Sequence, residues 1–341
     1  MRIVTFGEIM LRLKSPNQER FLQSPNFEAT FGGGEANVAV SLANFGMDVC
    51  FVTALPNNAL ADACIKELRG YNVDINQIKR TAGRMGIYFL EGGANQRPSL
   101  VVYDRAESSL ALAGRETFDW CKIFTGADWF HITGITPAIS EKAADISLDA
   151  IKTAKTLGLM VSIDLNYRKN LWKYGKNASD IMKELLTFSD VCIANEEDIQ
   201  KSLSIQTDLD TIGVTYDESI YKKLCEDVFQ SFPNLKLIAI TLRESINANQ
   251  NNWSACLHDG KNFFVSEKFV LSDIVDRVGG GDSFCGGLIF ALINGTKPSQ
   301  ALEFAVAASC LKHSIYGDFN RVTIGEVNYL MNGDKSGRVK R

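Results

Sequence analysis

Six short apolar runs, separated by segments with helical periodicity, constrain the fold of this chain more than any other feature. The runs are IVTFGE, VCFVTAL, ADWFHIT, LMVSIDLN, DVCIAN and KLIAITL. They are rich in β-branched and aromatic residues and apolar on both faces, which is typical of strands buried in a parallel sheet. The sequence therefore predicts an α/β protein, with a mostly parallel central sheet flanked by helices on both faces. The expected helices lie at about 36–45, 59–69, 140–157, 178–187, 216–231, 282–294 and 299–313.

Composition and charge exclude several classes of protein. A formal net charge of −4 gives no reason to expect nucleic acid as a ligand. The amino-terminal apolar run is short and contains Glu8 and Arg12, so we expect neither a signal peptide nor a membrane segment, and we expect a cytoplasmic protein. The eight cysteines form no C-x-x-C pair and are expected to be buried free thiols. The basic segment 335–341 is expected to be a flexible tail.

The segment GIYFLEGGANQRPSLVVYDR, residues 86–105, interrupts the alternation of strands and helices. Two alternating runs flank a connection that contains glycine and proline, which predicts a β-hairpin that projects from the main sheet. The period of two places Val101, Tyr103 and Arg105 on one face of the second strand. An aromatic ring beside a guanidinium suits a polar, anionic small molecule. The alternative is a solvated edge strand that carries a surface arginine.

Three consecutive glycines, Gly279 to Gly281, stand directly before Asp282 and an apolar helical segment. Free N–H groups at a helix amino terminus, approached closely past glycines, form a cradle for a phosphate. A carboxylate in an anion site would repel the ligand unless it serves as a general base, accepting the proton of an attacking hydroxyl. The alternative is that Asp282 is only an N-cap and that the glycines form a turn.

Polar side chains follow two neighbouring strands at the point where each is expected to end. Asp164, Asn166 and Arg168 alternate after LMVSID and would share a face if the strand continued. NEED, residues 195–198, follows DVCIA in the same kind of position. Clustered oxygen atoms beyond the carboxyl ends of parallel strands suit Mg²⁺ and substrate phosphates. For NEED the alternative is a helix start with acids that complement the helix dipole.

A second glycine run, FGGGEANVAVSLANFG (31–46), leads into a helix. Read as G-x-G-x-x-N, it is the basis of an alternative, a dinucleotide-binding oxidoreductase. That pattern lacks a third glycine and does not follow the first strand. We expect instead that Gly32 and Gly33 let a sugar-like substrate approach the backbone, and that Asn37 donates a hydrogen bond to it.

Both glycine runs resemble signatures of the ribokinase-like, or PfkB, family of sugar kinases. GGGEANVAVSLANFG is similar to the amino-terminal signature and DRVGGGDSFCGGLI to the carboxy-terminal one, and the resemblance extends from GEIMLRL to HSIYGDFN. It implies a ribokinase-like fold with a small β-sheet lid, Asp282 as catalytic base and Gly279 to Gly281 as anion hole. It also implies one domain over residues 1–334, with lid segments at about 9–31 and 85–106.

Within that family, the lid pattern Y-x-R and the segment DLNYRKNLW are similar to kinases of keto-deoxy sugar acids. This resemblance implies ATP-dependent phosphorylation of 2-keto-3-deoxygluconate on its C6 hydroxyl. It assigns the sugar acid to Tyr88, Tyr103, Arg105 and Arg168, together with Asp164 and Asn166. A fixed fork of donors suits a carboxylate better than a neutral hydroxyl. A fructokinase, a ribokinase and a non-catalytic sugar-acid sensor remain alternatives.

The chain departs from the family pattern at its expected nucleotide and metal sites. The metal motif N-x-x-E appears as NEED, so Asn195 and the shorter Asp198 are expected to hold Mg²⁺, Asp198 through water. The nucleotide segment appears as a longer polar loop, TLRESINANQNNWSA. Arg277 and Val278 replace small residues, and a monovalent cation such as K⁺ near Asp276 is a further candidate. A homo-oligomer paired through the lid edge is left open. The candidate nucleotide-binding residues are Asn195, Thr241, Arg243, Ser245, Gly279, Gly281 and His313.

Overall fold

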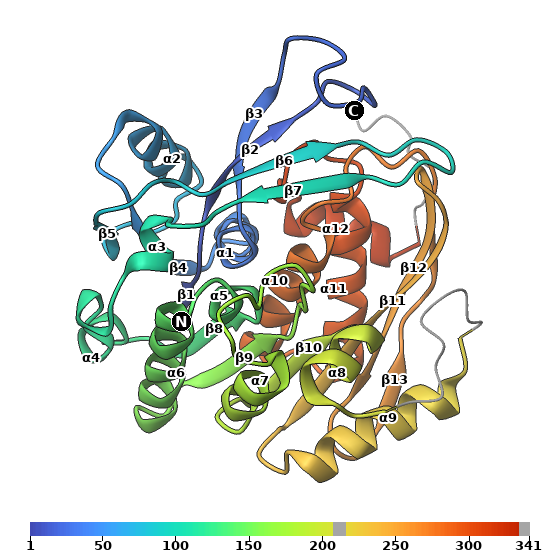
Figure 1. Ribbon diagram of the computed structural model, residues 1–341. Helices are drawn as coiled ribbons and strands as arrows, with labels where there is room; N and C mark the ends of the chain where they lie inside the picture. Colours follow the sequence, from blue (N-terminus) through green and yellow to red (C-terminus); the bar gives the residue numbers. More distant parts are fainter. Residues whose placement is uncertain (207–215, 334–341) are drawn as a thin grey trace.

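The computed structural model describes residues 1–206 and 216–333 and has the α/β architecture expected from the sequence (Figure 1). The central sheet consists of β1 (Arg2–Phe6), β4 (Asp48–Leu55), β5 (Ile78–Arg80), β8 (Trp129–Thr133), β9 (Met160–Asp164), β10 (Val191–Ala194), β11 (Leu237–Asn247), β12 (Gln250–His258), β13 (Phe263–Val265) and β14 (Phe269–Leu271). The helices are α1 (Gly34–Asn44), α2 (Ala59–Gly70), α3 (Ser109–Leu112), η1 (Arg115–Thr117), α4 (Trp120–Ile123), α5 (Ile135–Ala138), α6 (Glu141–Thr156), α7 (Ala178–Leu186), α8 (Glu196–Leu203), α9 (Glu218–Ser231), α10 (Gly280–Ile293), α11 (Pro298–Lys312) and α12 (Ile324–Met331).

The strand order of the central sheet is β13-β12-β11-β10-β9-β8-β1-β4-β5, with β14 also paired to β12. All neighbours from β5 to β11 are parallel, whereas β12 runs antiparallel to β11, β13 and β14. Because parallel strands end at the same edge, the residues that follow β8, β9 and β10 are brought together there.

Two hydrophobic cores lie on the two faces of this sheet, which explains why its strands are apolar on both sides. In β10, Val191 and Ile193 belong to the core formed with α1, α10 and α11, while Cys192 and Ala194 belong to the core formed with α6, α7 and α9. The four residues of β10 are thus buried alternately against one helical layer and the other (Figure 1).

A second sheet of four strands lies beside the carboxyl edge of the central sheet (Figure 1). Its order is β3-β2-β6-β7, and the expected hairpin 86–105 forms its β6 and β7. The strands of this small sheet are β2 (Met10–Lys14), β3 (Glu28–Gly32), β6 (Ile87–Glu91) and β7 (Leu100–Asp104).

The structure differs from the sequence prediction in the β11–β12 region and in the burial of two cysteines. Residues 241–255, expected as a polar loop, are most of a long hairpin in which β11 and β12 pair from Ile238 and His258 to Asn247 and Gln250. Cys121, expected to be buried, is exposed, and Cys310 is half-buried, while the other six cysteines are buried and free. The expected basic tail, 335–341, lies outside the described residues. Within residues 1–206 and 216–333, no helix has the length and apolar character needed to span a bilayer.

Candidate functional site

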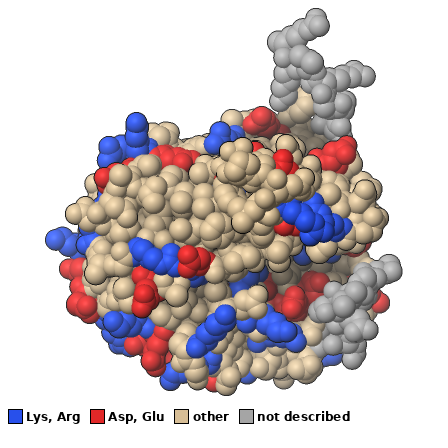
Figure 2. All heavy atoms as spheres, turned by 45° about the horizontal axis from the view of Figure 1, so that its top comes forward, with Lys and Arg blue, Asp and Glu red and all other residues tan. Residues whose placement is uncertain are grey.

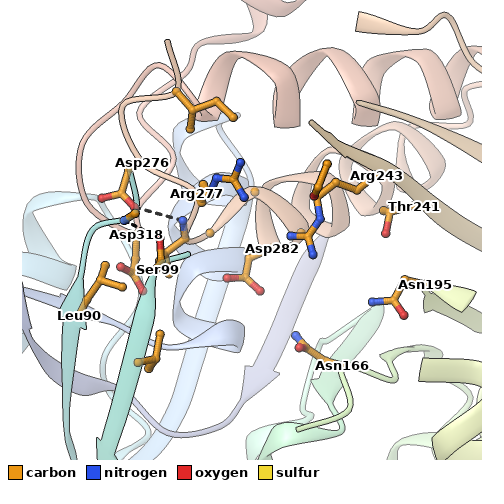
Figure 3. A pocket seen from close by; sticks show the side chains of 18 of the residues that line it. Leu90, Ser99, Asn166, Asn195, Thr241, Arg243, Asp276, Arg277, Asp282 and Asp318 are labelled. Carbon is orange, nitrogen blue, oxygen red and sulfur yellow. Dashed lines mark hydrogen bonds between the residues drawn. The ribbon is translucent and has the colours of Figure 1, made fainter. Parts of the chain in front are cut away.

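A cavity of ≈ 1320 Å³ lies between the small sheet and the carboxyl edge of the central sheet. Figure 2 shows this side of the molecule, where charges of both signs surround a hollow and a broad uncharged area. The volume is large enough for two metabolites at once, since single-ligand pockets usually measure about 300–1,000 Å³. In Figure 3, Asp276 and Asp318 lie on one side of Asp282, and Thr241, Arg243 and Asn195 lie on the other.

Asp282 lies at the floor of this cavity, in the first turn of α10. The helix begins at Gly280, and Gly279 is its N-cap with a left-handed φ of 82°, a conformation that favours glycine. Asp282 is therefore inside the helix and makes no side-chain cap, so the N-cap alternative is wrong. The amides of Gly280 and Gly281 belong to the first turn, where N–H groups have no partner within the helix.

The Asp282 carboxyl is buried, and a hydrogen bond from Asn37 fixes its orientation. Asn37 Nδ2 donates to its Oδ2 at 2.7 Å, and Gly33 N donates to Asn37 Oδ1 at 3.2 Å. Burial, opposed by the Asn37 hydrogen bond, raises the pKa of Asp282 to about 6. Such a group is ionised at neutral pH and still basic enough to accept a proton. Asn37, expected to bind the sugar, lines the cavity and also bonds to the carboxyl that we expect to act as base.

Asp164, Asn166 and Arg168 all line the cavity, although not as one continued strand. β9 ends at Asp164, and Asn166 has a left-handed φ of 38°, so the chain turns after the sheet edge. Asn166 Nδ2 donates to Asp164 Oδ2 at 3.1 Å. Burial, with the nearby charges of Asp198 and Asp282, raises the pKa of Asp164 well above its ordinary range.

The NEED segment forms the start of α8, as its alternative interpretation expected. Asn195 is the N-cap, its Oδ1 accepts from Asp198 N at 2.8 Å, and Asp198 Oδ2 accepts from Asn195 N at 3.2 Å, which is a capping box. Asp198 Oδ1 also accepts from Tyr167 N at 2.8 Å. Burial raises the pKa of Asp198 to about 6. Both residues line the cavity, so a capping role and a place beside a ligand coexist.

On the side of the small sheet, Arg105 and Tyr103 extend into the cavity as the strand periodicity indicated. Arg105 is 6% exposed, and its Nε donates to Glu8 Oε2 at 2.7 Å. Its guanidinium also lies 5.7 Å from the centre of the Tyr103 ring. The interpretation of Arg105 as a surface arginine is therefore wrong. Glu8 was not expected at the site from the sequence. The one feature that could have indicated it is its position as a charged residue within an apolar run.

Two of the expected site residues do not line the cavity. A Cβ on Gly32 would lie 2.0 Å from Asp318 Oδ2, so Gly32 makes room for that carboxyl and not for substrate. His313 is buried behind the glycine loop, because a Cβ on Gly280 would lie 2.8 Å from its Cε1. Its Nδ1 bonds to Ser309 O at 2.7 Å, and burial lowers its pKa to about 4. Gly33, by contrast, does line the cavity.

The expected nucleotide-binding residues Thr241, Arg243 and Ser245 alternate along β11 and line the far end of the cavity. Arg243 and Ser245 are exposed, and Thr241 Oγ1 donates to Ala194 O at 3.4 Å. Arg243 was expected in a loop, and it occupies a strand position next to Trp253 of β12 instead.

Sequence reasoning missed a buried cluster of charges beneath the glycine loop. Arg12 of β2 donates through Nη1 to Asp318 Oδ1 at 2.6 Å and pairs through Nη2 with Asp276. Tyr88 Oη, expected to contact substrate, donates to the same Asp318 oxygen at 2.6 Å. The sequence did carry a signal for this cluster, the alternation of Met10, Arg12 and Lys14 with Leu11 and Leu13. In the structure the strand face that carries Arg12 and Lys14 is buried, and the leucine face is half-buried.

Glu35, in the amino-terminal signature, is a second buried carboxyl that was not singled out. Its Oε1 accepts hydrogen bonds from Thr133 N, Thr133 Oγ1 and Thr136 Oγ1 at 2.9, 2.9 and 2.7 Å. A Cβ on Gly7 would lie 2.0 Å from Glu35 Oε2. Burial raises the pKa of Glu35 to about 7. These contacts tie the start of α1 to the ends of β1 and β8.

A family-wide sequence comparison matches residues 1–222 and 254–320 to the pfkB family carbohydrate kinases. The chain belongs to this family. It is therefore a kinase that uses ATP with a divalent metal ion, and the oxidoreductase alternative is wrong. The ribokinase-like fold and the family resemblance of the two glycine-run signatures are confirmed.

Individual relatives share nearly the whole length of the chain. A 2-dehydro-3-deoxygalactonokinase from Haloferax volcanii is 30% identical over 98% of both chains. A 2-dehydro-3-deoxygluconokinase from Thermoproteus tenax is 26% identical over 93% of this chain and 89% of its own. The crystal structure of a 2-dehydro-3-deoxygluconokinase from Thermotoga maritima superposes with a TM-score of 0.92, at 47% identity, over 98% of this chain and 100% of the other.

Proposed function

We propose that this protein transfers the γ-phosphoryl group of ATP to the C6 hydroxyl of 2-keto-3-deoxygluconate, giving 2-keto-3-deoxy-6-phosphogluconate and ADP. The observation that carries this proposal is the position of Asp282, a buried carboxyl in the first turn of α10, in a cavity that is also lined by buried Arg105 and by the candidate nucleotide-binding residues of β11. The substrate class is supported by the similarity to the kinase from Thermotoga maritima.

Asp282 would accept the proton of the C6 hydroxyl as its oxygen attacks the γ-phosphorus. Because Asn37 bonds to Oδ2, the other carboxylate oxygen is available for this proton. The free amides of Gly280 and Gly281 would stabilise charge on the transferred group, as helix amino termini do for phosphates. Direct in-line transfer needs no covalent intermediate on the protein.

The carboxylate of the sugar acid would be bound by arginine. Arg105 presents a guanidinium whose orientation is fixed by Glu8, and Arg168, which follows β9, also lines the cavity. A planar fork of donors recognises a carboxylate with two parallel hydrogen bonds, which a neutral sugar hydroxyl cannot match. We infer that the small sheet acts as a lid, with Tyr103 and Arg105 excluding water from ATP.

Mg²⁺ fits the carboxyl edge of the sheet. Three carboxyls, Asp164, Asp198 and Asp282, are buried there, and burial raises the pKa of each, because water no longer stabilises its charge. Asn195 and Asp198 would hold the ion, Asp198 through water, since both of its oxygens already accept backbone N–H groups. When bound, the ion would neutralise charge on the phosphate oxygens of ATP.

A coupled assay of ADP release with Mg·ATP tests the proposal. The panel contains 2-keto-3-deoxygluconate, 2-keto-3-deoxygalactonate, fructose, ribose and gluconate, with Asp282→Asn as the control for background ATP hydrolysis. Turnover with the keto-deoxy acids is the expected result. Preference for fructose or ribose would contradict the assignment of Arg105 and Arg168 to the substrate carboxylate. No measurable turnover with any of the five acceptors would favour a sugar-acid sensor.

One second candidate substrate has a specific observation behind it. 2-Keto-3-deoxygalactonate differs from the first substrate only at C4, and the relative from Haloferax volcanii is named for that acid. The same base and the same arginines would serve both acids, so their relative kcat/KM in the panel decides between them. We also propose that the protein acts in the cytoplasm. A homo-oligomer paired through an edge of the small sheet stays a prediction.

A further inference from the structure

The loop that precedes the glycine cradle is held by a buried arginine from the small sheet. Arg12 is fully buried, and its guanidinium bridges Asp276 and Asp318. Asp276 begins the loop that leads to Gly279, and its Oδ1 accepts from Val278 N at 3.1 Å. The backbone oxygen of Asp318 packs against Gly279, since a Cβ there would lie 2.2 Å from it. Arg12 therefore fixes both walls of the cradle.

The polar atoms around Asp276 do not fit a bound K⁺ ion. K⁺ is held by a shell of oxygen atoms that replaces its hydration. Here the Asp276 carboxylate faces N–H donors, because Oδ2 accepts from Gly317 N at 3.1 Å and pairs with Arg12, while Oδ1 is taken by Val278 N. An added cation would have to displace a guanidinium that is buried in direct contact with two carboxylates.

The charges of this cluster also balance without an added ion. Asp276 and Asp318 are two buried acids, and Arg12 and Lys312 are two buried cations. Tyr88 remains neutral, because burial and Asp318 raise its pKa well above the ordinary value. A charge left in so buried a place without a partner would be strongly unfavourable, so the loop needs its cation.

We propose that Arg12 is a resident cation that positions the Asp276 to Gly281 loop for phosphoryl transfer, and that the enzyme needs no monovalent metal ion. The proposal rests on the proposed kinase function, in which this loop binds the transferred phosphate. Arg12 is a positioning residue, since it acts through Asp276 and Asp318. Because Arg12 lies on β2, the geometry of the cradle also depends on the position of the small sheet relative to the central sheet.

The first test compares wild-type ADP release in potassium, sodium and tetramethylammonium salts at equal ionic strength. We expect rates that agree within about twofold, because the site needs no ion. Potassium stimulation of wild type by more than about fivefold over tetramethylammonium would overturn the proposal.

The second test uses Arg12→Ala, which should open space beside Asp276 and remove its cation. We expect kcat to fall roughly 10- to 100-fold with a smaller change in the KM for ATP, because the cradle is displaced and not the nucleotide strand. Potassium ions, or guanidinium ions at a low concentration, should restore part of the kcat of Arg12→Ala, and tetramethylammonium ions should not. Wild-type kcat in Arg12→Ala, or a loss that neither small cation relieves, would contradict the positioning role.

Lys14→Met is the matched control, since Lys14 is the next buried cation on the same face of β2 and donates to Ser15 O and Asn17 O, away from Asp276. It should acquire no potassium response, and acquiring one would count against Arg12.

The unfolding temperature gives a readout without substrate: potassium should raise it for Arg12→Ala beyond its effect on wild type. Because this measurement needs no substrate, it remains valid if the proposed kinase function is wrong. Equal effects of potassium on the unfolding temperatures of wild type and Arg12→Ala would refute the proposal. If Arg12→Ala does not fold, Arg12→Lys should fold and stay independent of potassium, and a potassium requirement there would refute the proposal.

Discussion

The two ends of the cavity differ in how they hold charge. Under the small sheet, Arg105 lines the cavity, is 6% exposed and is ion-paired with buried Glu8, and Arg12, which lies beneath the glycine loop, is 0% exposed and ion-paired with two buried carboxylates. At the proposed nucleotide end, Arg243 of β11 is exposed and lines the cavity. At the proposed acceptor end the arginines are therefore held by ion pairs before any ligand binds, whereas at the proposed nucleotide end Arg243 is exposed.

This difference follows from the cost of burying a charge. A buried guanidinium needs a partner at all times, so Glu8 and the Asp276–Asp318 pair hold the arginines in one orientation. An exposed guanidinium is solvated by water and needs no such partner. Specificity should thus be concentrated at the acceptor end, where an unsuitable ligand would leave polar groups unpaired.

The largest expected effect is at Asp282, between the two ends. Asp282→Asn should lower kcat by roughly 10²- to 10⁴-fold, because the amide cannot accept the hydroxyl proton. Binding of Mg·ATP should change little, since the nucleotide end is untouched. Steady-state kinetics and calorimetric titration with a non-hydrolysable ATP analogue measure the two quantities. A substantial loss of nucleotide affinity would show that Asp282 belongs to the nucleotide end.

Next in size is the loss of the acceptor arginine. Arg105→Ala should raise the KM for the sugar acid roughly 10- to 100-fold, because a charge-assisted hydrogen bond is lost and Glu8 is left unpaired. The KM for ATP should stay within about twofold of wild type. Initial-rate measurements with each substrate varied in turn separate the two effects. The double variant Arg105→Ala, Glu8→Gln serves as control, and it should recover part of the folding stability but not the KM.

A smaller effect is expected for the exposed arginine. Arg243→Ala should raise the KM for ATP by about two- to fivefold and leave the KM for the sugar acid unchanged, because an exposed charge contributes about 0–1 kcal/mol. The effect should shrink as ionic strength increases. A change in the sugar-acid KM as large as that of Arg105→Ala would erase the distinction between the two ends.

The smallest expected effect is on stability. The folded pKa of Asp282, about 6, lies above the ordinary carboxyl value of 3.8, so the stability that its neutral form contributes is present at low pH and is lost as pH rises through about 6. Asp282→Asn does not ionise and should unfold at a temperature roughly 2–4 °C higher than wild type at pH 8. Thermal unfolding at pH 8 and pH 5 checks this, since the difference should shrink at the lower pH. A difference that grows toward acid would contradict the direction of the pKa shift.

Much of the fold was predictable because apolar periodicity is a local signal. All six expected strands and all seven expected helices exist, with boundaries shifted by a few residues. The β11–β12 hairpin was missed because its outer half, from Arg243 to Asn247, is polar and only partly buried. No apolar run marks such strands, so their pairing cannot be deduced from periodicity.

The candidate site was predictable where one short segment carries the chemistry. Gly279 to Asp282 form a cradle and a carboxyl within four residues, and both lie at the cavity. The ion pairs of Arg12 with Asp276 and Asp318 were missed, although Asp276 was a candidate cation site, because these contacts join residues as far as 306 positions apart. Gly32 and His313 were expected in the site, but Gly32 packs against Asp318 and His313 packs behind Gly280, and periodicity and motifs do not reveal such packing.

The most direct measurement is kcat/KM for 2-keto-3-deoxygluconate across a pH range that spans the pKa of Asp282, in wild type and in Asp282→Asn. If Asp282 is the base, the wild-type value should be level at neutral pH and fall about tenfold per pH unit below an apparent pKa of about 6, as the carboxylate is protonated. The variant should be far slower and lack this limb. Wild-type turnover in Asp282→Asn, or the same acid limb in both proteins, would contradict the account.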